Sequence, residues 1–220
     1  MMSKANPFLL ALAGALATMT AAHAQDAAAG AAKAAACIGC HGIPGYQASF
    51  PEIHKVPKIS GQNAKYIVAA LTAYKKGERR HPTMRSQAAS MTDADMADLA
   101  AYYEKSAPSS PVKLVADTPT VQPSAEVAGL LSKGACVSCH GANFSKPINP
   151  SYPKLAGQYP DYLTVALRAY GTTNNPNVGR GNAIMSGQVK QFKREELAAM
   201  AKYIGSLDGE LHTVPQSKFR

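Results

Sequence analysis

Apolar residues recur at helical spacing along this chain, and the segment 63–76 is the clearest case. Its apolar and aromatic residues at positions that share one helical face are Tyr66, Ile67, Ala70, Leu71 and Tyr74. No segment alternates apolar and polar residues over several positions, as a half-buried strand would. The pattern therefore predicts an all-α fold.

The predicted helices form two matching sets of three. They span 27–36, 63–76 and 92–105 in the first half, and 125–135, 161–170 and 194–207 in the second. Thr92 is a suitable N-cap for the third helix, because its side-chain oxygen can accept a hydrogen bond from the first turn. Asp93 and Asp95 follow it, and acidic side chains suit the positive end of a helix dipole.

The two halves also repeat each other in sequence. Matched residues are Gly30 with Gly129, Cys37 with Cys136, Tyr66 with Tyr162, Arg79 with Arg180, Met84 with Met185 and Tyr102 with Tyr203. The string Pro-Lys-Ile-Ser-Gly-Gln at 57–62 likewise matches Pro-Lys-Leu-Ala-Gly-Gln at 153–158. The repeat predicts two homologous domains.

A proline-rich segment separates the halves, and four prolines within 107–123 prevent a continuous helix there. We therefore expect one domain at 25–106, a linker at 107–123 and a second domain at 124–220.

The first 24 residues have the features of a secretory signal peptide. Lys4 precedes an apolar run at 8–17, and Ala22-His23-Ala24 forms a small-x-small site, so cleavage is expected before Gln25. The alternative is an uncleaved membrane anchor, but the apolar run is short for a membrane span. The mature protein is expected in the periplasm.

The chain is basic, with a formal net charge of +9 at pH 7. A positive excess favours acidic protein partners or a loose association with an anionic membrane surface, whereas export excludes nucleic acid as a partner. The alternative is that scattered Lys and Arg only keep the surface soluble. A monomer is expected.

All four cysteines lie in two copies of Cys-x-x-Cys-His, at 37–41 and 136–140. This string is the attachment signature of a c-type haem, in which each thiol bonds one vinyl group and the histidine ligates the iron. The sequence therefore predicts two covalently bound haem c groups. The predicted attachment residues are Cys37, Cys40, Cys136 and Cys139, and the predicted ligands beside them are His41 and His140.

A redox dithiol and a zinc site are the alternative roles for the cysteines. A zinc site normally has about 15–20 residues between its Cys pairs, whereas here 96 positions separate Cys40 from Cys136. A thioredoxin-like dithiol would need a βαβ context, which the sequence does not show.

The match between the two halves indicates which residue is the second iron ligand in each domain. The candidates in the first half are Met84, Met91, Met96, His54 and His81, and those in the second are Met185, Met200 and His212. Met84 and Met185 match each other, and both are predicted in an irregular segment before the last helix. His81 is the rival in the first domain, and packing roles for both methionines are the remaining alternative.

Three further pairs of residues have expected roles around the haem. The backbone carbonyls of Pro57 and Pro153 can orient the two histidines, although a rigid turn explains these prolines equally well. Arg79 and Arg180 can bind haem propionates or can simply be exposed. Two glycines, Gly30 and Gly129, are expected where the first helix crosses the last, against Tyr102 and Tyr203.

Both halves resemble the class I cytochrome c family, and the chain is most similar to its dihaem cytochrome c4 group. The resemblance rests on Cys-x-x-Cys-His, the Pro-Lys-x-x-Gly-Gln string, the matched methionine and the tyrosine of the last helix. It implies that Pro57 and Pro153 orient the histidines, that Met84 and Met185 are distal ligands, and that helices cross at the glycines. It also implies two tandem class I cytochrome c-like domains in a periplasmic electron carrier. The basic charge and the nearby His81 are departures from the family pattern.

One-electron transfer between a membrane donor complex and a terminal oxidase is the expected function. Irons closed by His and Met leave no open site for a substrate, so the protein is not expected to be an enzyme, and this ligation raises the reduction potential. Alternatives are an electron-accepting subunit of a dehydrogenase, a dihaem peroxidase and a thiosulfate-oxidising cytochrome. The last often uses a Cys ligand, and no spare Cys exists here.

Overall fold

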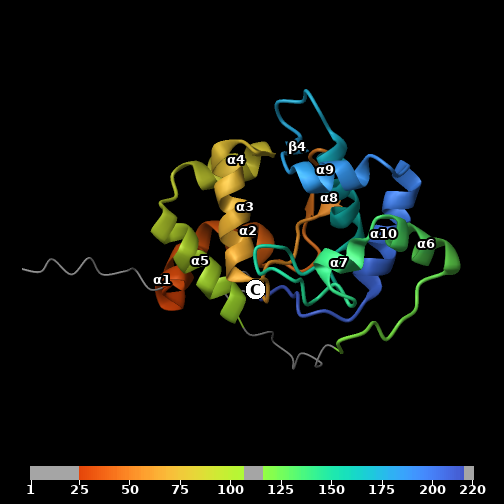
Figure 1. The fold of residues 1–220 in the computed structure, drawn as a ribbon. Coiled ribbons are helices and arrows are strands. Elements are labelled where there is room, and N and C mark those ends of the chain that lie inside the picture. Colours follow the sequence, from red (N-terminus) through yellow and green to blue (C-terminus); the bar gives the residue numbers. More distant parts are fainter. Residues whose placement is uncertain (1–24, 107–115, 216–220) are drawn as a thin grey trace, which may run out of the picture.

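The computed structural model describes residues 25–106 and 116–215. The predicted signal peptide, 1–24, and the first part of the predicted linker, 107–115, lie outside the described residues. The two halves of the chain form two helical domains side by side (Figure 1). The first domain contains α1 (Ala27–Lys33), α2 (Ala35–His41), α3 (Ala64–Lys76), α4 (Pro82–Ala89) and α5 (Asp93–Lys105). The second contains α6 (Ala125–Lys133), α7 (Cys136–His140), α8 (Pro160–Gly171), α9 (Ala183–Val189) and α10 (Arg194–Ser206).

The predicted helix ends agree closely with the structure where the sequence supplies a cap. Thr92 Oγ1 accepts from the Asp95 N–H at 3.1 Å, and the Asp95 carboxylate accepts from the Thr92 N–H at 2.9 Å. This capping box starts α5 at the predicted position. At the other end of α3, Gly77 adopts a left-handed φ of 77°, which stops the helix at little steric cost.

The first helix of the first domain crosses the last one at Gly30, as predicted. A Cβ added at Gly30 would lie 2.1 Å from the Asp98 carbonyl oxygen and 2.7 Å from Tyr102 Cβ, so only glycine fits this crossing of α1 and α5. The predicted helix 27–36 is, however, two helices that meet at Ala34. The second of them, α2, carries the whole first Cys-x-x-Cys-His string.

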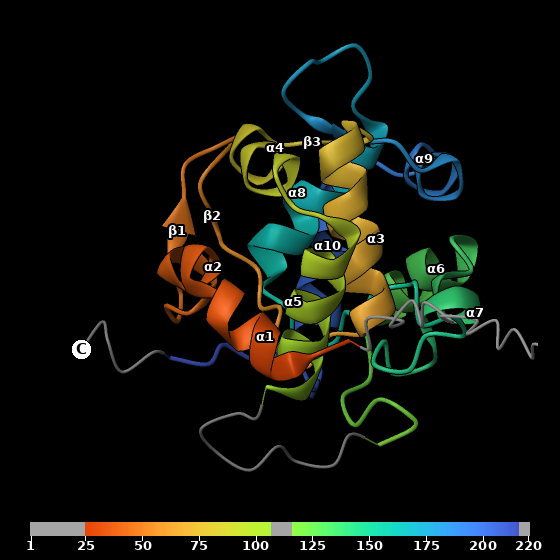
Figure 2. The same ribbon diagram turned by 90° about the vertical axis from the view of Figure 1, so that its left-hand side faces the viewer.

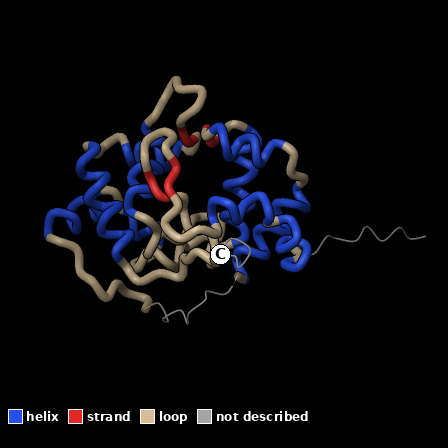
Figure 3. Tube along the Cα trace, turned by 180° about the vertical axis from the view of Figure 1, so that it is seen from behind, coloured by secondary structure: helices blue, strands red, loops and turns tan. Residues whose placement is uncertain are grey.

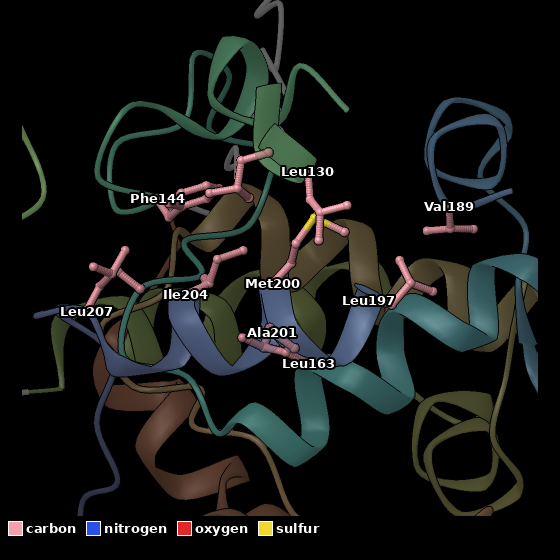
Figure 4. Close-up of a cluster of buried hydrophobic side chains, with 11 residues drawn as sticks. Leu130, Phe144, Leu163, Val189, Leu197, Met200, Ala201, Ile204 and Leu207 are labelled. Carbon is pink, nitrogen blue, oxygen red and sulfur yellow. The ribbon is translucent and has the colours of Figure 1, made fainter. Parts of the chain in front are cut away.

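The matching prediction for Gly129 is wrong. No atom lies within 4 Å of a Cβ added there, and Gly129 is exposed on α6. The second domain instead packs α6 through Leu130, which points toward Met200 of α10 (Figure 4). Tyr203 does not contact Gly129; it packs partly buried against the core of the second domain, and its hydroxyl donates to the Val121 carbonyl at 3.0 Å. The first helix therefore packs differently in the two domains.

The expectation that the two matched methionines lie in irregular segments is also wrong. Met84 lies in α4 and Met185 in α9, both short helices before the last helix of each domain. His81 and Asn182 are the N-caps of these helices. The side chain at each N-cap accepts a hydrogen bond from the first turn and so stabilises the helix. Both helices are too short for their apolar pattern to have predicted them.

Within residues 25–106 and 116–215, four strands of two residues interrupt the helical fold, and the sequence pattern did not predict them. β1 (Gln47–Ala48) pairs with β2 (His54–Lys55) to form a hairpin near α2 (Figure 2). β3 (Arg79–Arg80) pairs antiparallel with β4 (Gly179–Arg180), with Arg79 opposite Arg180 (Figure 3). This second pair joins the two domains, because each strand comes from a different half of the chain.

The two glutamines of the repeated Pro-Lys-x-x-Gly-Gln strings also join the domains. Gln62 Nε2 donates to the Lys154 carbonyl at 3.0 Å, and Gln62 Oε1 accepts from the Lys154 N–H at 2.9 Å. Gln158 makes the same pair of bonds with Lys58, at 2.9 and 3.0 Å. Both glutamines are 4% exposed. We call Gln62, Lys154, Gln158 and Lys58 the glutamine lock. Because its two halves make the same contacts, an approximate two-fold axis relates the two domains.

Candidate haem sites and domain interface

Each Cys-x-x-Cys-His histidine is held by the proline that the sequence analysis paired with it. His41 Nδ1 donates to the Pro57 carbonyl at 2.8 Å, and His140 Nδ1 donates to the Pro153 carbonyl at 3.4 Å. Burial lowers the pKa of both imidazoles, against the opposing effect of these hydrogen bonds. Both rings are therefore neutral near pH 7, and their Nε2 lone pairs are available to a metal.

The two histidines line one cavity of about 610 Å³ that spans both domains. The predicted haem residues that line it are Cys37, Cys40, His41, Met84, Cys139, His140 and Met185. Cys136 is not among the lining residues; it packs partly buried against the core of the second domain. The cavity thus brings together three of the four cysteines with both histidines and both methionines that the repeat selected.

The remaining candidate ligands differ in their placement. Met96 and Met200 are 1% and 4% exposed in the two cores, so they are packing residues, as expected. His212 is engaged through both ring nitrogens, with the Glu210 and Ser106 carbonyls at 2.7 and 2.9 Å. Met91 and His54, in contrast, also line the cavity in the first domain. The choice of Met84 over Met91 therefore depends on the repeat, since Phe192 stands where a second Met91 would be.

The rival ligand His81 has a structural role that its match in the second domain shares. His81 Nδ1 accepts from the Met84 N–H at 3.5 Å, and Asn182 Oδ1 accepts from the Met185 N–H at 2.9 Å. Both residues therefore cap the helix that carries the methionine. Burial lowers the pKa of His81, so the ring is neutral and can accept this bond near pH 7.

The β3–β4 pair places arginines beside tyrosines at the domain interface. Arg79 donates to the Tyr66 hydroxyl at 3.3 Å, and Arg180 donates to the Tyr162 hydroxyl at 2.9 Å. Burial raises the pKa of Tyr66, but the two guanidiniums outweigh it and the net pKa is lowered. Arg79 and Arg180 are partly buried and line the cavity, so the alternative of fully exposed arginines is wrong.

These residues fit a haem in each domain. The cavity walls supply neutral imidazoles, thioethers and apolar side chains, and its arginines have no Asp or Glu partner among the described residues. A haem propionate would supply that missing carboxylate. The Arg80 Nε is buried and likewise lacks an acceptor in the described part of the chain.

Two tandem helical domains, each with a Cys-x-x-Cys-His string facing a methionine across one cavity, define a dihaem cytochrome of the c type. The cytochrome c family model matches residues 27–106 and 124–208. The chain therefore belongs to the cytochrome c family, in its dihaem cytochrome c4 group. This membership confirms the predicted fold of two helical cytochrome c domains.

Three relatives illustrate the match. A cytochrome c4 from Azotobacter vinelandii is 31% identical over 198 residues, which cover 84% of this chain and 90% of the relative. A thiosulfate dehydrogenase electron acceptor from Thiomonas intermedia is 31% identical over 145 residues, which cover 63% and 64%. The solved cytochrome c4 structure of Acidithiobacillus ferrooxidans is 26% identical, with a TM-score of 0.58, and covers 79% of this chain and 99% of that one.

The family membership settles the cofactor and the general activity. The protein carries two covalently bound haem c groups, and it transfers electrons rather than catalysing a reaction. Within the described residues, no helix is long and apolar enough to cross a membrane.

Two sets of interface residues were not predicted from the sequence. The glutamine lock could have been suspected, because Gln62 and Gln158 are matched in the repeat and both follow a glycine. Arg80 carried no such signal, because Gly181 occupies its place in the second half.

Proposed function

We propose that the iron of each haem is held by one histidine and one methionine, His41 with Met84 and His140 with Met185. The supporting observation is the common cavity that all four side chains line. The histidine side is oriented by the Pro57 and Pro153 carbonyls, and the methionine side by the capped helices α4 and α9. His/Met ligation closes both faces of the iron and raises its reduction potential.

The same proposal assigns attachment and propionate contacts. Cys37 and Cys40 bind the first haem and Cys136 and Cys139 the second, through thioether bonds. Burial raises the pKa of Cys37 and Cys136, which keeps these thiols protonated before attachment. Arg79 and Arg180 bind propionates, since no carboxylate side chain pairs with them in the described residues.

Substitution of each methionine tests the ligand assignment. Ferric haem with a methionine ligand has a red charge-transfer band, and we expect Met84→His and Met185→His each to remove about half of it, since each of the two haems contributes one methionine ligand. The matched control is Met91→Leu, which should leave the band at full strength. An unchanged band in both histidine variants would refute the assignment.

We further propose that the mature protein is a monomeric periplasmic carrier of single electrons, between a membrane donor complex and a terminal oxidase. The support is the signal-like sequence at 1–24, the basic charge and the proposed closure of both irons. Redox partners of such carriers dock briefly over small interfaces. Rapid turnover of oxygen or peroxide by the reduced protein alone would contradict the carrier function and favour a dihaem peroxidase.

A second candidate is an electron-accepting cytochrome that serves a dehydrogenase. The observation that favours it is the similarity to the thiosulfate dehydrogenase electron acceptor of Thiomonas intermedia. Purification of the native protein from its source separates the two. Stable co-purification with a catalytic subunit supports the dehydrogenase role, and isolation as a free monomer supports the soluble carrier.

A further inference from the structure

Arg80 stands in the first domain, but its side chain crosses to the second. Arg80 Nη2 donates to the Thr172 carbonyl at 3.3 Å. The guanidinium also lies against Gly179, where an added Cβ would sit 2.1 Å from Nη2. The glycine therefore leaves room for an arginine that the other domain contributes.

The guanidinium of Arg80 is only partly satisfied by protein atoms. Its Nε is buried and has no hydrogen-bond partner among the described residues, and the residue lines the cavity. Leaving a buried N–H of a charged group unpaired is costly. The position therefore suits an acceptor inside the cavity, and a carboxylate is the strongest acceptor for a guanidinium.

The second domain has no arginine at the position that matches Arg80. Arg79 and Arg180 are equivalent and face each other in the β3–β4 pair, but the residue that corresponds to Arg80 is Gly181. Gly181 contributes only its backbone N–H, which donates to the Glu78 carbonyl at 2.6 Å. The first domain thus places the Arg80 guanidinium against the second domain, and the matched position of the second domain places no charge against the first.

We propose that Arg80 binds a propionate of the second haem across the domain interface and so raises the reduction potential of that haem more than that of the first. This inference rests on the haem sites proposed above. Reduction adds negative charge to a haem, so a nearby cation stabilises the reduced form and raises its potential. The burial of the contact limits its screening by salt.

The test measures each haem separately through its charge-transfer band. In a Met84→His background the band reports the second haem alone, and in a Met185→His background it reports the first. Potentiometric titration of the band then gives the midpoint of one haem at a time. Arg80→Gln is expected to lower the midpoint of the second haem by more than that of the first.

Two further variants make the result specific to the charge at this place. Arg80→Lys keeps the charge, so it should lower the midpoint potential of the second haem much less than Arg80→Gln does. If Arg80→Gln loses haem, the comparison of Arg80→Lys with the parent protein still tests the proposal. Arg85→Gln removes a charge from the exposed face of α4, away from the cavity, and should move both midpoints little.

Equal shifts of the two haems in Arg80→Gln, or a shift of the same size in Arg85→Gln, would overturn the role of Arg80. A large drop in Arg80→Lys would do the same. Absence of the charge-transfer band from the parent protein would instead overturn the methionine assignment, and this proposal with it. The two failures are therefore distinguishable.

Discussion

At the scale of single residues, His81 and Asn182 show how a repeat resolves an ambiguous position. A histidine three residues before a proposed methionine ligand is a reasonable rival for the iron. In the structure, both residues accept a hydrogen bond from the backbone N–H of the methionine that follows them. A capping role explains both His81 and Asn182, whereas a role as an iron ligand could explain only the histidine.

His81→Asn should therefore leave the first haem unchanged. Asparagine supplies the same capping oxygen that Asn182 supplies in the second domain. We expect the charge-transfer band to be retained in full and the free energy of unfolding to change by less than about 1 kcal/mol. His81→Ala removes the cap and should cost about 0.5–2 kcal/mol in a denaturant titration, still without loss of the band. A band at half strength in the parent protein that rises to full strength in His81→Asn would instead assign the first ligand to His81.

The residues that the sequence could predict are those with a fixed chemical spacing or a match in the repeat. Cys-x-x-Cys-His is readable because covalent attachment requires it, and Met84 is readable because Met185 repeats it. Arg80 is different, because its partner atoms come from Thr172 in the other half of the chain. A pairing over that sequence distance depends on how the domains dock, which no local pattern contains.

At the scale of helices, the long apolar segments were predicted well and the short ones were not. α3, α5, α8 and α10 begin and end within two residues of their predicted limits. The helices α4 and α9 are too short to show a helical apolar period, so their existence depends on their N-caps instead. The predicted equivalence of the two helix crossings failed because α6 presents Leu130, and not Gly129, to its neighbour.

Alanine at the two matched glycines should have opposite effects. Gly30→Ala forces a methyl group into the Asp98 carbonyl of α5 and should destabilise the protein by about 1–3 kcal/mol. Gly129→Ala adds a methyl group in open space and removes a glycine from a helix interior, so it should stabilise by up to about 1 kcal/mol. Chemical denaturation of the two variants compares them directly. Equal destabilisation in both would show that α6 crosses α10 at Gly129.

At the scale of the whole molecule, matched polar contacts join the two domains. The glutamine lock satisfies the backbone N–H and carbonyl groups of Lys58 and Lys154, and both glutamines are buried. Contacts of this kind require one relative placement of the domains. The sequence could predict two domains but not this docking, because the same glutamines would be unremarkable on an exposed turn.

Removal of either glutamine should weaken the docking. Gln62→Ala leaves the partly buried backbone groups of Lys154 without these partners, at a cost of about 1–3 kcal/mol, and Gln158→Ala does the same to Lys58. Denaturant titration measures the cost, and the exposed Gln191→Ala is the control, with little change expected. Costs for Gln62→Ala and Gln158→Ala no larger than the control would mean that the lock contributes nothing.

The interface should also depend on pH through Asp161. Its carboxylate accepts from the Lys55 N–H at 3.0 Å and from Lys55 Nζ at 3.2 Å. Burial raises the pKa of Asp161, but the hydrogen bonds from Lys55 and Tyr162 outweigh it, so the net pKa is lowered. The stabilising contribution is therefore complete above the ordinary aspartate pKa of about 4 and is lost as the pH falls through the lowered value.

Asp161→Asn provides the measurement. The difference in free energy of unfolding between the parent protein and this variant should be largest near neutral pH and should shrink below about pH 4. The exposed Glu195→Gln on α10 should show no such convergence. A difference for Asp161→Asn that stays constant across this pH range would contradict the role of the Lys55 contact.

The most direct test of the whole account is the visible spectrum of the purified protein, recorded oxidised and reduced together with the ratio of haem to polypeptide. We expect two haems for each chain and a red charge-transfer band in the oxidised protein whose strength corresponds to two methionine-ligated irons. One haem for each chain, or two haems with no such band, would contradict it.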